Sequence, residues 1–353
     1  MERYIGIDVH AHSCTVSVKG PSGRLLRTEV VETRGEALVE SVRKVIGRKY
    51  LCIEEGTQSQ WLHELLSPHV EDVAVIVPPQ TKGNKSDRID AEGLAEVARV
   101  GKAETRVYKA PGAFAGLRDA ARSYQMLSKD VARTRNRLKA VFRSRGLTEA
   151  GNDVYSQDSR KPWLQKLPAS SRRLAELLVS ELECLLPLKK QAEQWLNEEA
   201  QRHTEVARLK GIPGLGAIRA AQIVAVVVTP HRFRSSRQFW SYSGLAVVTR
   251  SSADWELRQS KWVRAAVTKT RGLNRNRQPL LKAIFKSAAT TVIARMTKHP
   301  LHQSYQRLLT AGTKPNLAKL TIARRIAAIC LAVWKTEEDY DPAKHESRST
   351  DHA

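Results

Sequence analysis

The stretch "RYIGIDVHA" at residues 3–11 places an aspartate, Asp8, inside an otherwise apolar run of strand type. "SCTVSVKG" at residues 13–20 alternates with a period of two, and "RLLRTEVVET" at residues 24–33 is a third run. The second and third runs are separated by turn residues, namely Gly20, Pro21, Ser22 and Gly23. Together these patterns predict an antiparallel meander of three strands.

Helix and strand patterns then alternate over the rest of the first 110 residues. "GEALVESVRKVIG" (35–47) and "SQWLHELLSPH" (59–69) show helical spacing, whereas "YLCIEEG" (50–56) and "VAVIVPP" (73–79) read as buried strands. A last helix follows in "NKSDRIDAEGLAEVA" (84–98). Three strands followed by helix, strand, helix, strand and helix is the element order of the ribonuclease H-like α/β fold.

Long helices are predicted for the middle of the chain, residues 111–205. Residues 117–147 repeat apolar side chains near heptad spacing and carry nine basic against two acidic residues. A second helical stretch covers residues 170–209, after an irregular link at 151–170. Two such helices indicate either a protruding antiparallel coiled coil, a common dimerisation device, or an ordinary helix pair in a bundle. The sequence leaves both open.

The net charge of +23 is concentrated in residues 206–336. That region has 24 lysines and arginines against Asp254 and Glu256 alone, while residues 1–205 carry 33 basic and 28 acidic residues. Such a block is typical of a domain that binds nucleic acid, and the alternatives are an effect on solubility and an acidic protein partner. We expect a mostly helical basic domain here and a disordered tail at residues 337–353.

Two surfaces are predicted to contact nucleic acid. Gly214 and Gly216, in "LKGIPGLGAIRAAQ", resemble the turn of a helix-hairpin-helix, whose amides can meet a phosphate; an unliganded glycine loop would look identical. Tryptophans that interleave with the charges, Trp240, Trp255 and Trp262, would either stack on unpaired bases or pack in the core. The predicted basic contacts are Arg118, Arg122, Lys129, Arg133, Arg137 and Arg145 on the first long helix, and Arg232, Arg234, Arg237, Lys261, Arg264, Arg271, Arg275 and Arg277 in the C-terminal block.

We expect four carboxylates to meet at one edge of the predicted sheet: Asp8, Glu54, Asp87 and Asp90. Their repulsion would raise their pKa values unless cations neutralise them, which favours a site for two Mg²⁺ ions, with Mn²⁺ as a substitute. Each carboxylate also has a simpler role. Asp87 is a candidate helix N-cap, Asp90 a first-turn acid, and Glu54 a partner of some basic neighbour, with Glu55 as its rival ligand.

Histidines and cysteines offer little further chemistry. His10 and His12 follow Asp8 as an HxH pair, for which a turn position is favoured over a metal role. The cysteines are far apart and are predicted to be reduced, buried thiols: Cys14, Cys52, Cys184 and Cys330. Because the N-terminus lacks signal-peptide features and no apolar run could cross a bilayer, we expect a cytoplasmic protein without membrane contact.

Three motifs carry a family resemblance. "IGIDVH", "CIEEG" and "KSDRIDAEGLA" resemble the acidic motifs of the DEDD transposases of the insertion sequence one-ten family, and "LKGIPGLGAIRAAQIVA" and "FWSYSGLAVVTRSS" resemble that family's C-terminal domain. The resemblance covers nearly the whole chain. It implies a RuvC-like domain whose metal tetrad is Asp8, Glu54, Asp87 and Asp90. It also implies a coiled coil for assembly into dimers and tetramers, a double-stranded DNA substrate and a structured noncoding guide RNA.

The resemblance further implies a nucleophilic serine in the C-terminal domain. Family members usually carry it before a glycine, a few residues after a Gly-Leu pair. Here Ser252 stands at that spacing from Gly244 and Leu245 but precedes Ala253. Rival serines are Ser251, which is adjacent, and the remoter Ser243 and Ser260. We therefore expect a transposase. The alternatives are a site-specific DNA invertase of the pilin-gene type, a RuvC-like nuclease, and a nucleic-acid-binding protein without metal.

Overall fold

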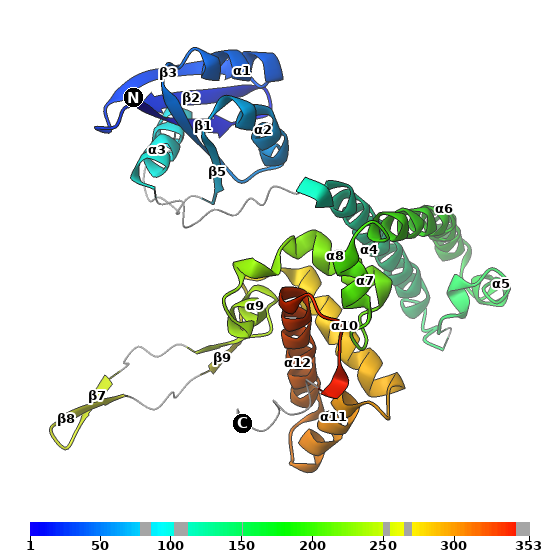
Figure 1. Cartoon of the computed structure of the whole chain (residues 1–353). Helices are drawn as coiled ribbons and strands as arrows, with labels where there is room; N and C mark the ends of the chain where they lie inside the picture. Colours follow the sequence, from blue (N-terminus) through cyan, green and yellow to red (C-terminus); the bar gives the residue numbers. More distant parts are fainter. Residues whose placement is uncertain (78–85, 102–111, 150, 250–254, 265–269, 344–353) are drawn as a thin grey trace. The chain divides into compact units, whose positions relative to one another are not determined.

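The structure is a computed structural model that describes residues 1–77, 86–101, 112–149, 151–249, 255–264 and 270–343 (Figure 1). The chain divides into two compact units, Met1–Ala110 and Pro111–Ala353. Separate hydrophobic cores lie within them. Among the described residues, every helix is too short or too polar to cross a membrane.

A five-stranded mixed sheet forms the centre of the first unit, with the strand order β3-β2-β1-β4-β5 (Figure 1). Its strands are β1 (Glu2–Val9), β2 (Ser13–Lys19), β3 (Leu25–Glu32), β4 (Arg48–Glu54) and β5 (Asp72–Ile76). β1, β2 and β3 are joined antiparallel, so the predicted meander is confirmed. β4 and β5 add on parallel to β1, which places β1 in the middle of the sheet.

Helices cover both faces of this sheet. On one face, Ile5 and Ile7 of β1 share a core with Leu38 of α1 (Gly35–Arg43) and Leu62 of α2 (Ser59–Leu66). A short 3-10 turn, η1 (Ser67–His69), follows α2. On the opposite face, Leu94 of α3 (Asp87–Val100) packs on Cys52 and Ile76. The predicted order of strands and helices is therefore confirmed.

Gly6 allows α3 to lie directly on β1. A Cβ atom at Gly6 would stand 2.1 Å from the carbonyl oxygen of Ala91 and 2.3 Å from the amide nitrogen of Ala95. Only a glycine leaves room for the helix backbone at this point. Because strand residues two apart point to the same face, Asp8 also faces α3, one helical turn nearer to its N-terminus.

Two long helices form an antiparallel hairpin in the second unit: α4 (Ala115–Arg143) and α6 (Ala169–Ala200). Leu117 at the start of α4 shares a core with Leu196 near the end of α6. At the other end, Phe142 packs in a smaller cluster with Ala175. The link between them contains η4 (Asp153–Tyr155) and α5 (Lys161–Gln165), and η3 (Gly112–Phe114) precedes α4.

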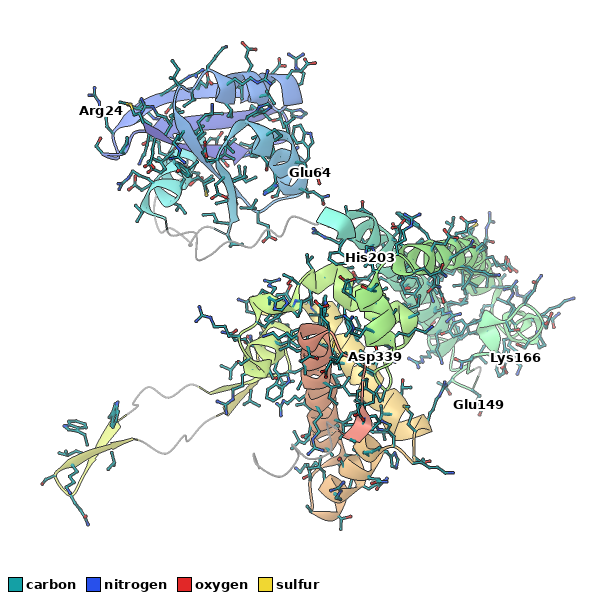
Figure 2. All side chains as sticks on the ribbon, viewed as in Figure 1. Arg24, Glu64, Glu149, Lys166, His203 and Asp339 are labelled. Atoms are coloured by element: carbon teal, nitrogen blue, oxygen red, sulfur yellow. The ribbon has the colours of Figure 1, made fainter. Side chains whose placement is uncertain are left out.

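The predicted helix over residues 170–209 is wrong at its C-terminal end. α6 ends at Ala200, His203 is extended with φ −122° and ψ 112°, and a separate helix α7 (Thr204–Lys210) begins after it. The His203 side chain, labelled in Figure 2, is buried. Its ring centroid lies 4.9 Å from that of the Phe114 ring. This contact with the start of α4 is tertiary, so the local helical pattern could not reveal the break.

A compact helical core makes up most of the C-terminal half. Its elements are α8 (Gly216–Val227), η5 (Pro230–Arg232), α9 (Ser236–Tyr242), α10 (Pro279–Arg295), α11 (Pro300–Thr310) and α12 (Pro315–Thr336). β6 (Val247–Thr249) pairs with β9 (Thr270–Leu273), and β7 (Trp255–Arg258) pairs with β8 (Lys261–Arg264). The same core includes Leu117 of α4 and Leu196 of α6, so the long helices are anchored in it.

Four free cysteines are spread over the two units. Cys14, Cys52 and Cys330 are buried, as predicted. Cys184 is exposed on α6, so the prediction of four buried thiols is wrong at this position.

Candidate metal centre and nucleic-acid interface

The N-terminus of α3 is fixed by Ser86 rather than by Asp87. The Ser86 side chain accepts a hydrogen bond from the amide of Ile89 at 3.3 Å, and its backbone is extended as in an N-cap residue. The alternative that Asp87 caps the helix is therefore wrong. Asp87 and Asp90 both stand in the first turn, where the helix dipole favours negative charge.

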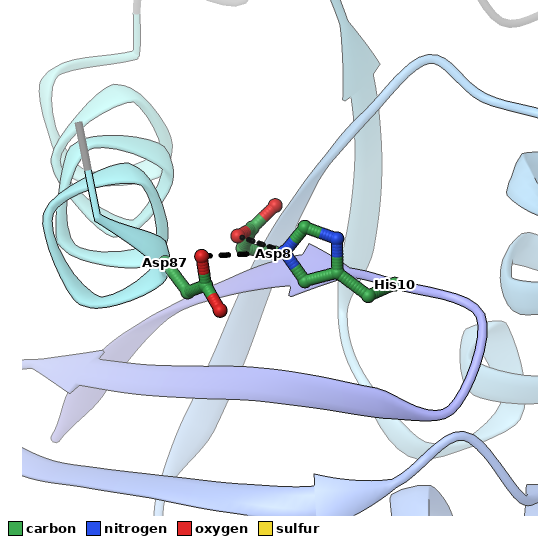
Figure 3. Close-up of side chains that lie close together, drawn as sticks. All are labelled: Asp8, His10 and Asp87. Carbon is green, nitrogen blue, oxygen red and sulfur yellow. Dashed lines mark ion pairs between the residues drawn. The ribbon is translucent and has the colours of Figure 1, made fainter.

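Asp8, His10 and Asp87 lie close together at the end of β1 (Figure 3). The His10 Nε2 atom is 3.2 Å from Asp8 Oδ2 and 3.4 Å from Asp87 Oδ1. One ligand atom from each of the three residues lies within 4.8 Å of the other two. Within the described part of the chain, these three side chains are close enough together to share a single metal ion.

Asp8 is the buried member of the group, with only 8% of its surface exposed. Burial raises the pKa of its carboxyl group, because a charged carboxylate is less stable away from water. Contact with His10 lowers this pKa, whereas the nearby charges of Asp87 and Asp90 raise it. Burial and repulsion therefore destabilise the charged form of Asp8, and a bound cation would stabilise it.

The other two predicted carboxylates lie farther from this group. Glu54 ends β4 and follows Ile53, which is paired with Ile7 of β1, so Glu54 is the neighbour of Asp8 across the parallel strands. Its side chain is exposed. Asp90 influences Asp8 through its charge. Neither Glu54 nor Asp90 belongs to the close group of Asp8, His10 and Asp87.

His10 is the site residue for which the sequence favoured a turn position over a metal role. It lies with His12 in the turn after β1, as favoured, but its side chain returns to Asp8 and Asp87. The His10 amide donates to the carbonyl of Ser13 at 3.0 Å, and the Thr33 hydroxyl donates to the His10 carbonyl at 2.8 Å. These bonds hold the turn in place. The spacing of two residues from Asp8 was the only sequence feature that pointed to this contact.

The predicted nucleophile, Ser252, and its rival Ser251 lie outside the described residues. Ser243 is fully buried at the end of α9, and its hydroxyl has no hydrogen-bond partner among the residues that the structure describes. Ser260 is exposed at the turn between β7 and β8. Of these two remoter candidates, only Ser260 is accessible to a DNA phosphate.

The basic residues on α4 and just beyond it differ in solvent exposure and in their contacts with other side chains. Arg122, Lys129 and Arg137 are exposed. Arg133 is exposed too, and its Nη1 atom lies 3.3 Å from Asp130 Oδ1. Arg145, just beyond the helix, donates to the hydroxyl of Ser171 at 2.9 Å. Arg118 is half-buried near the start of α4.

The C-terminal block keeps most of its predicted basic side chains at the surface. The exposed ones are Arg232, Arg234, Arg237, Lys261 and Arg275, whereas Arg277 is half-buried. Arg232 lies over the Tyr242 ring, 5.0 Å from its centroid. The side chains of Arg264 and Arg271 lie outside the described ones.

Like charges crowd one another in this block. Burial, followed by the positive charges of Arg277 and Lys286, lowers the pKa of Lys282. Burial and the charge of Arg307 lower the pKa of Arg325. With only two acidic residues in this region of the sequence, a polyanion is the natural source of compensating charge.

Gly214 and Gly216 occupy different environments at the start of α8. Gly214 has φ +80°, and a Cβ atom there would meet the Ala288 carbonyl oxygen of α10 at 2.5 Å. Arg219 reinforces this contact by donating to the Gly214 carbonyl and to the Ser287 hydroxyl. Gly216, with φ +62°, has open space around it. Packing thus explains Gly214, and Gly216 is the more accessible of the two for a phosphate.

The three tryptophans of the C-terminal block differ in exposure. The Trp240 indole donates to the Arg324 carbonyl at 2.9 Å and packs against the core. Trp255 and Trp262, on the paired strands β7 and β8, are exposed.

Two family models match this chain. A DEDD transposase model of the IS110 group, described as a transposase, matches residues 5–145 and so includes the group at Asp8. A second model, described as the transposase IS116/IS110/IS902 family, matches residues 206–306. The two matches together span more than half of the chain. The protein belongs to this transposase family.

Curated relatives of this transposase agree with the assignment. The transposase for insertion sequence element IS1111A of Coxiella burnetii is 22% identical over 342 residues, covering 88% of this chain and 85% of that protein. The y4pF/y4sB protein of Sinorhizobium fredii, named as a candidate transposase, is 23% identical over 323 residues, covering 84% of this chain and 75% of that protein. The chain is thus a DNA transposase, and its family type is one that uses divalent metal.

Proposed function

We propose that this transposase cuts and rejoins DNA strands of an insertion sequence with a metal-binding tetrad in its first unit and a serine nucleophile in its second. The observation that carries the proposal is the contact between β1 and the N-terminus of α3, where Gly6 lets Asp8 and Asp87 approach with His10 between them. Placing a buried aspartate beside a second carboxylate costs free energy unless a cation compensates the two negative charges.

The first unit is proposed to have a ribonuclease H-like, RuvC-like architecture. The strand order β3-β2-β1-β4-β5, with β2 antiparallel to its neighbours, supports this. So does the position of Asp8 on the central strand, with Glu54 at the equivalent level of the adjacent parallel strand.

The donors in this unit suit Mg²⁺, or Mn²⁺ in its place. Asp8 and Asp87 provide carboxylate oxygens, which hard divalent cations prefer, and Glu54 and Asp90 would complete the tetrad around two ions. His10 adds an imidazole nitrogen, which Mn²⁺ accepts more readily than Mg²⁺ does. When bound, such ions would supply Lewis-acid stabilisation of charge on the phosphate and lower the pKa of a nucleophilic hydroxyl.

The chemical step is assigned to Ser252. Its hydroxyl oxygen attacks the phosphorus of the scissile phosphodiester, its proton passes to a base, and the bond from phosphorus to the 3′ oxygen breaks. The products are a phosphoserine link to one strand end and a free 3′ hydroxyl on the other. A 3′ hydroxyl from the exchanged strand then attacks the phosphoserine, which restores the serine and joins the new strands.

DNA is proposed to contact α4 and the basic C-terminal block. Arg122, Lys129 and Arg137 form an exposed row on α4, and Arg234, Arg237 and Arg275 are exposed in the C-terminal block. The open N-terminus of α8 at Gly216 offers backbone amides to a phosphate. Much of this contact would be independent of sequence, since phosphates carry no sequence information.

A structured noncoding guide RNA is proposed to supply the sequence choice. The support is the family membership together with an excess of positive charge large enough for a second nucleic acid. Expression in the cytoplasm, where DNA and RNA are both present, fits this role.

Assembly into dimers and tetramers is proposed to use α6. This helix exposes a second apolar row beside its stripe of buried residues: Leu174, Leu177, Leu188 and Trp195. These residues fall on the a and d positions of one heptad frame, which is the spacing of a coiled-coil seam. A second copy of the helix, packed on this row, would bury it.

The function is tested by trapping the covalent intermediate. Purified full-length protein is mixed with the element's flanking noncoding RNA, junction DNA and Mg²⁺, and protein–DNA adducts are resolved on denaturing gels. The wild type should form an adduct that disappears with a chelator, with Asp87→Ala and with Ser252→Ala. The matched control is Asp119→Ala, which removes an exposed acid from α4. Ser260→Ala tests the accessible rival serine, and an adduct that survives this change excludes Ser260 as the nucleophile.

Each other outcome contradicts part of the proposal. An adduct that persists in Ser252→Ala removes Ser252 as nucleophile, and loss in Ser251→Ala would then move the role to its neighbour. Mg²⁺-dependent nicking without an adduct would indicate a RuvC-like nuclease. Inversion of a defined DNA segment without excision would indicate an invertase, and binding without any cleavage would indicate an inactive nucleic-acid-binding protein.

A further inference from the structure

The β7–β8 hairpin is a tight ribbon with a fixed register. Leu257 pairs directly with Trp262, and Trp255 pairs with Arg264. Gln259 and Ser260 form the turn with φ values of +47° and +59°, the left-handed backbone of a two-residue hairpin turn. This two-residue turn fixes the register of the two strands. Because non-glycine residues rarely adopt a left-handed backbone, the turn is strained.

One face of this ribbon is aromatic and uncovered. Because alternate residues of a strand share a face, Trp255, Leu257 and Trp262 point to the same side. Their exposed fractions are 59%, 59% and 68%. The two indoles are diagonal neighbours across the strands, within reach of one flat ligand or of two stacked ones.

The ribbon cannot bury this face by itself. Two strands without a helix or further strands have no second layer against which apolar side chains can pack. Trp240, by contrast, is packed against the helical core of the same unit. The exposed indoles of Trp255 and Trp262 are therefore available to pack against a binding partner.

Charge identifies the class of partner. Residues 250–271 carry six basic and two acidic residues, and Lys261 beside the turn is exposed. Unpaired bases offer flat faces to indoles while their phosphates meet cations, which is how single-stranded nucleic acid is held. An apolar protein surface would cover the indoles but would leave the positive charges without partners.

We propose that Trp255 and Trp262 stack on unpaired DNA bases next to the cleaved phosphodiester, with Leu257 adding apolar contact on the same face. DNA is preferred to RNA because Trp255 follows Ser252 by three residues. The preference for DNA thus rests on the proposed serine chemistry. The hairpin would hold bases out of their pairs while the strands are exchanged, a role separate from the electrostatic contacts of α4.

The test measures binding of the full-length protein without chemistry, in the presence of a chelator. Two fluorescein-labelled DNAs of one sequence are compared by anisotropy, one fully paired and one with a short central mismatch bubble, together with a single-stranded RNA of the bubble sequence. The variants are Trp255→Ala/Trp262→Ala, Trp255→Phe/Trp262→Phe, and the control Trp61→Ala, which removes a partly exposed indole from α2.

Wild-type protein should bind the bubble more tightly than the duplex. The double alanine variant should lose roughly 10- to 100-fold in bubble affinity, as expected for lost base stacking, and keep its duplex affinity. The phenylalanine variant should recover most of the loss, since a smaller ring still stacks. Trp61→Ala should behave as wild type.

Several results would overturn the proposal. An equal loss on duplex and bubble would make the hairpin a general binding arm, and a loss confined to RNA would make the occupant RNA. An unchanged affinity would remove any role in base contact. A shift in oligomeric state by sedimentation would mean that a second copy covers the face. Failure of the serine chemistry is detected separately, by the adduct assay.

Discussion

Gly6 of β1 lies directly against the backbone of Ala91 in α3, where a Cβ atom would stand 2.1 Å from the Ala91 carbonyl oxygen. This close approach sets the height of α3 above the sheet. One turn before Ala91, the helix begins at Asp87, opposite Asp8. A missing side chain at position 6 therefore determines the geometry of the candidate metal centre.

Gly6→Ala should destabilise the first unit by about 1–3 kcal/mol, because the helix backbone has to move away from the strand. The same movement should separate Asp8 from Asp87 and weaken Mn²⁺ binding. Urea unfolding measures the first effect, and Mn²⁺ titration by electron paramagnetic resonance measures the second.

Gly93→Ala is the matched control on α3. A Cβ atom at Gly93 meets nothing within 4 Å, so this change should raise stability by about 0.5–1 kcal/mol through helix propensity. Metal binding should stay as in the wild type. Equal behaviour of the two alanine variants would show that the Gly6 contact does not set the site.

Asp8→Asn should stabilise the metal-free protein at neutral pH while abolishing metal binding. The folded pKa of Asp8 is raised above 3.8 by burial, so the folded state binds more protons than the unfolded state in the window just above that value. Wild-type stability should therefore fall as pH rises through this window, and the advantage of Asn should vanish below it.

Added metal should reverse that order. At about 100 times the dissociation constant, Mg²⁺ or Mn²⁺ should stabilise the wild type by about 2.7 kcal/mol and leave Asp8→Asn unchanged. Thermal unfolding with and without metal, at several pH values, checks both statements. A wild type more stable than Asp8→Asn without metal at neutral pH would contradict the assignment of Asp8.

His10→Ala should weaken Mn²⁺ binding roughly 10- to 100-fold, the usual effect of removing a group that contacts metal-holding carboxylates. The physical reason is that His10 Nε2 lies within 3.4 Å of Asp8 and Asp87 oxygens and orients both. His12→Ala, in the same turn, is the control and should bind normally. Identical affinities for the two variants would exclude His10 from the site.

Cys184 reports on the proposed pairing of α6 helices. It stands near the middle of Ala169–Ala200, so an antiparallel pair centred there brings the two Cys184 thiols together and sets Leu174 opposite Trp195. Mild oxidation should give a covalent dimer that Cys184→Ser prevents and Cys330→Ser, at a buried site, does not. Leu177→Glu/Leu188→Glu should convert the dimer to monomer in sedimentation. A dimer unaffected by those charges would place the interface elsewhere.

DNA affinity should depend steeply on salt. With six to ten phosphate contacts, binding should weaken on the order of a thousandfold or more between about 50 and 200 mM salt. Arg122→Gln and Arg137→Gln should each reduce the slope by about one, whereas Arg160→Gln, whose guanidinium pairs with Glu183, should not. A flat salt response would argue against a phosphate-binding surface.

Local patterns were sufficient for most of the secondary structure. The apolar alternation around Asp8 and the Gly20–Gly23 turn predicted the meander that the sheet contains. The same approach failed at His203, where a contact with Phe114 ends a helix that the pattern would continue. The prediction of burial also failed at Cys184. α6 has apolar residues on more than one face, and the local pattern does not tell which face packs against the rest of the protein.

The sequence by itself determined the order of elements, the position of the acidic residues on them, and the excess of positive charge, because these depend on neighbouring residues and composition. The tertiary structure alone decided that His10 turns back onto Asp8 and Asp87, that Trp240 is packed while Trp255 and Trp262 are exposed, and that Gly214 packs against α10. Those outcomes depend on which distant segments meet, and steric fit between them is not written in local spacing.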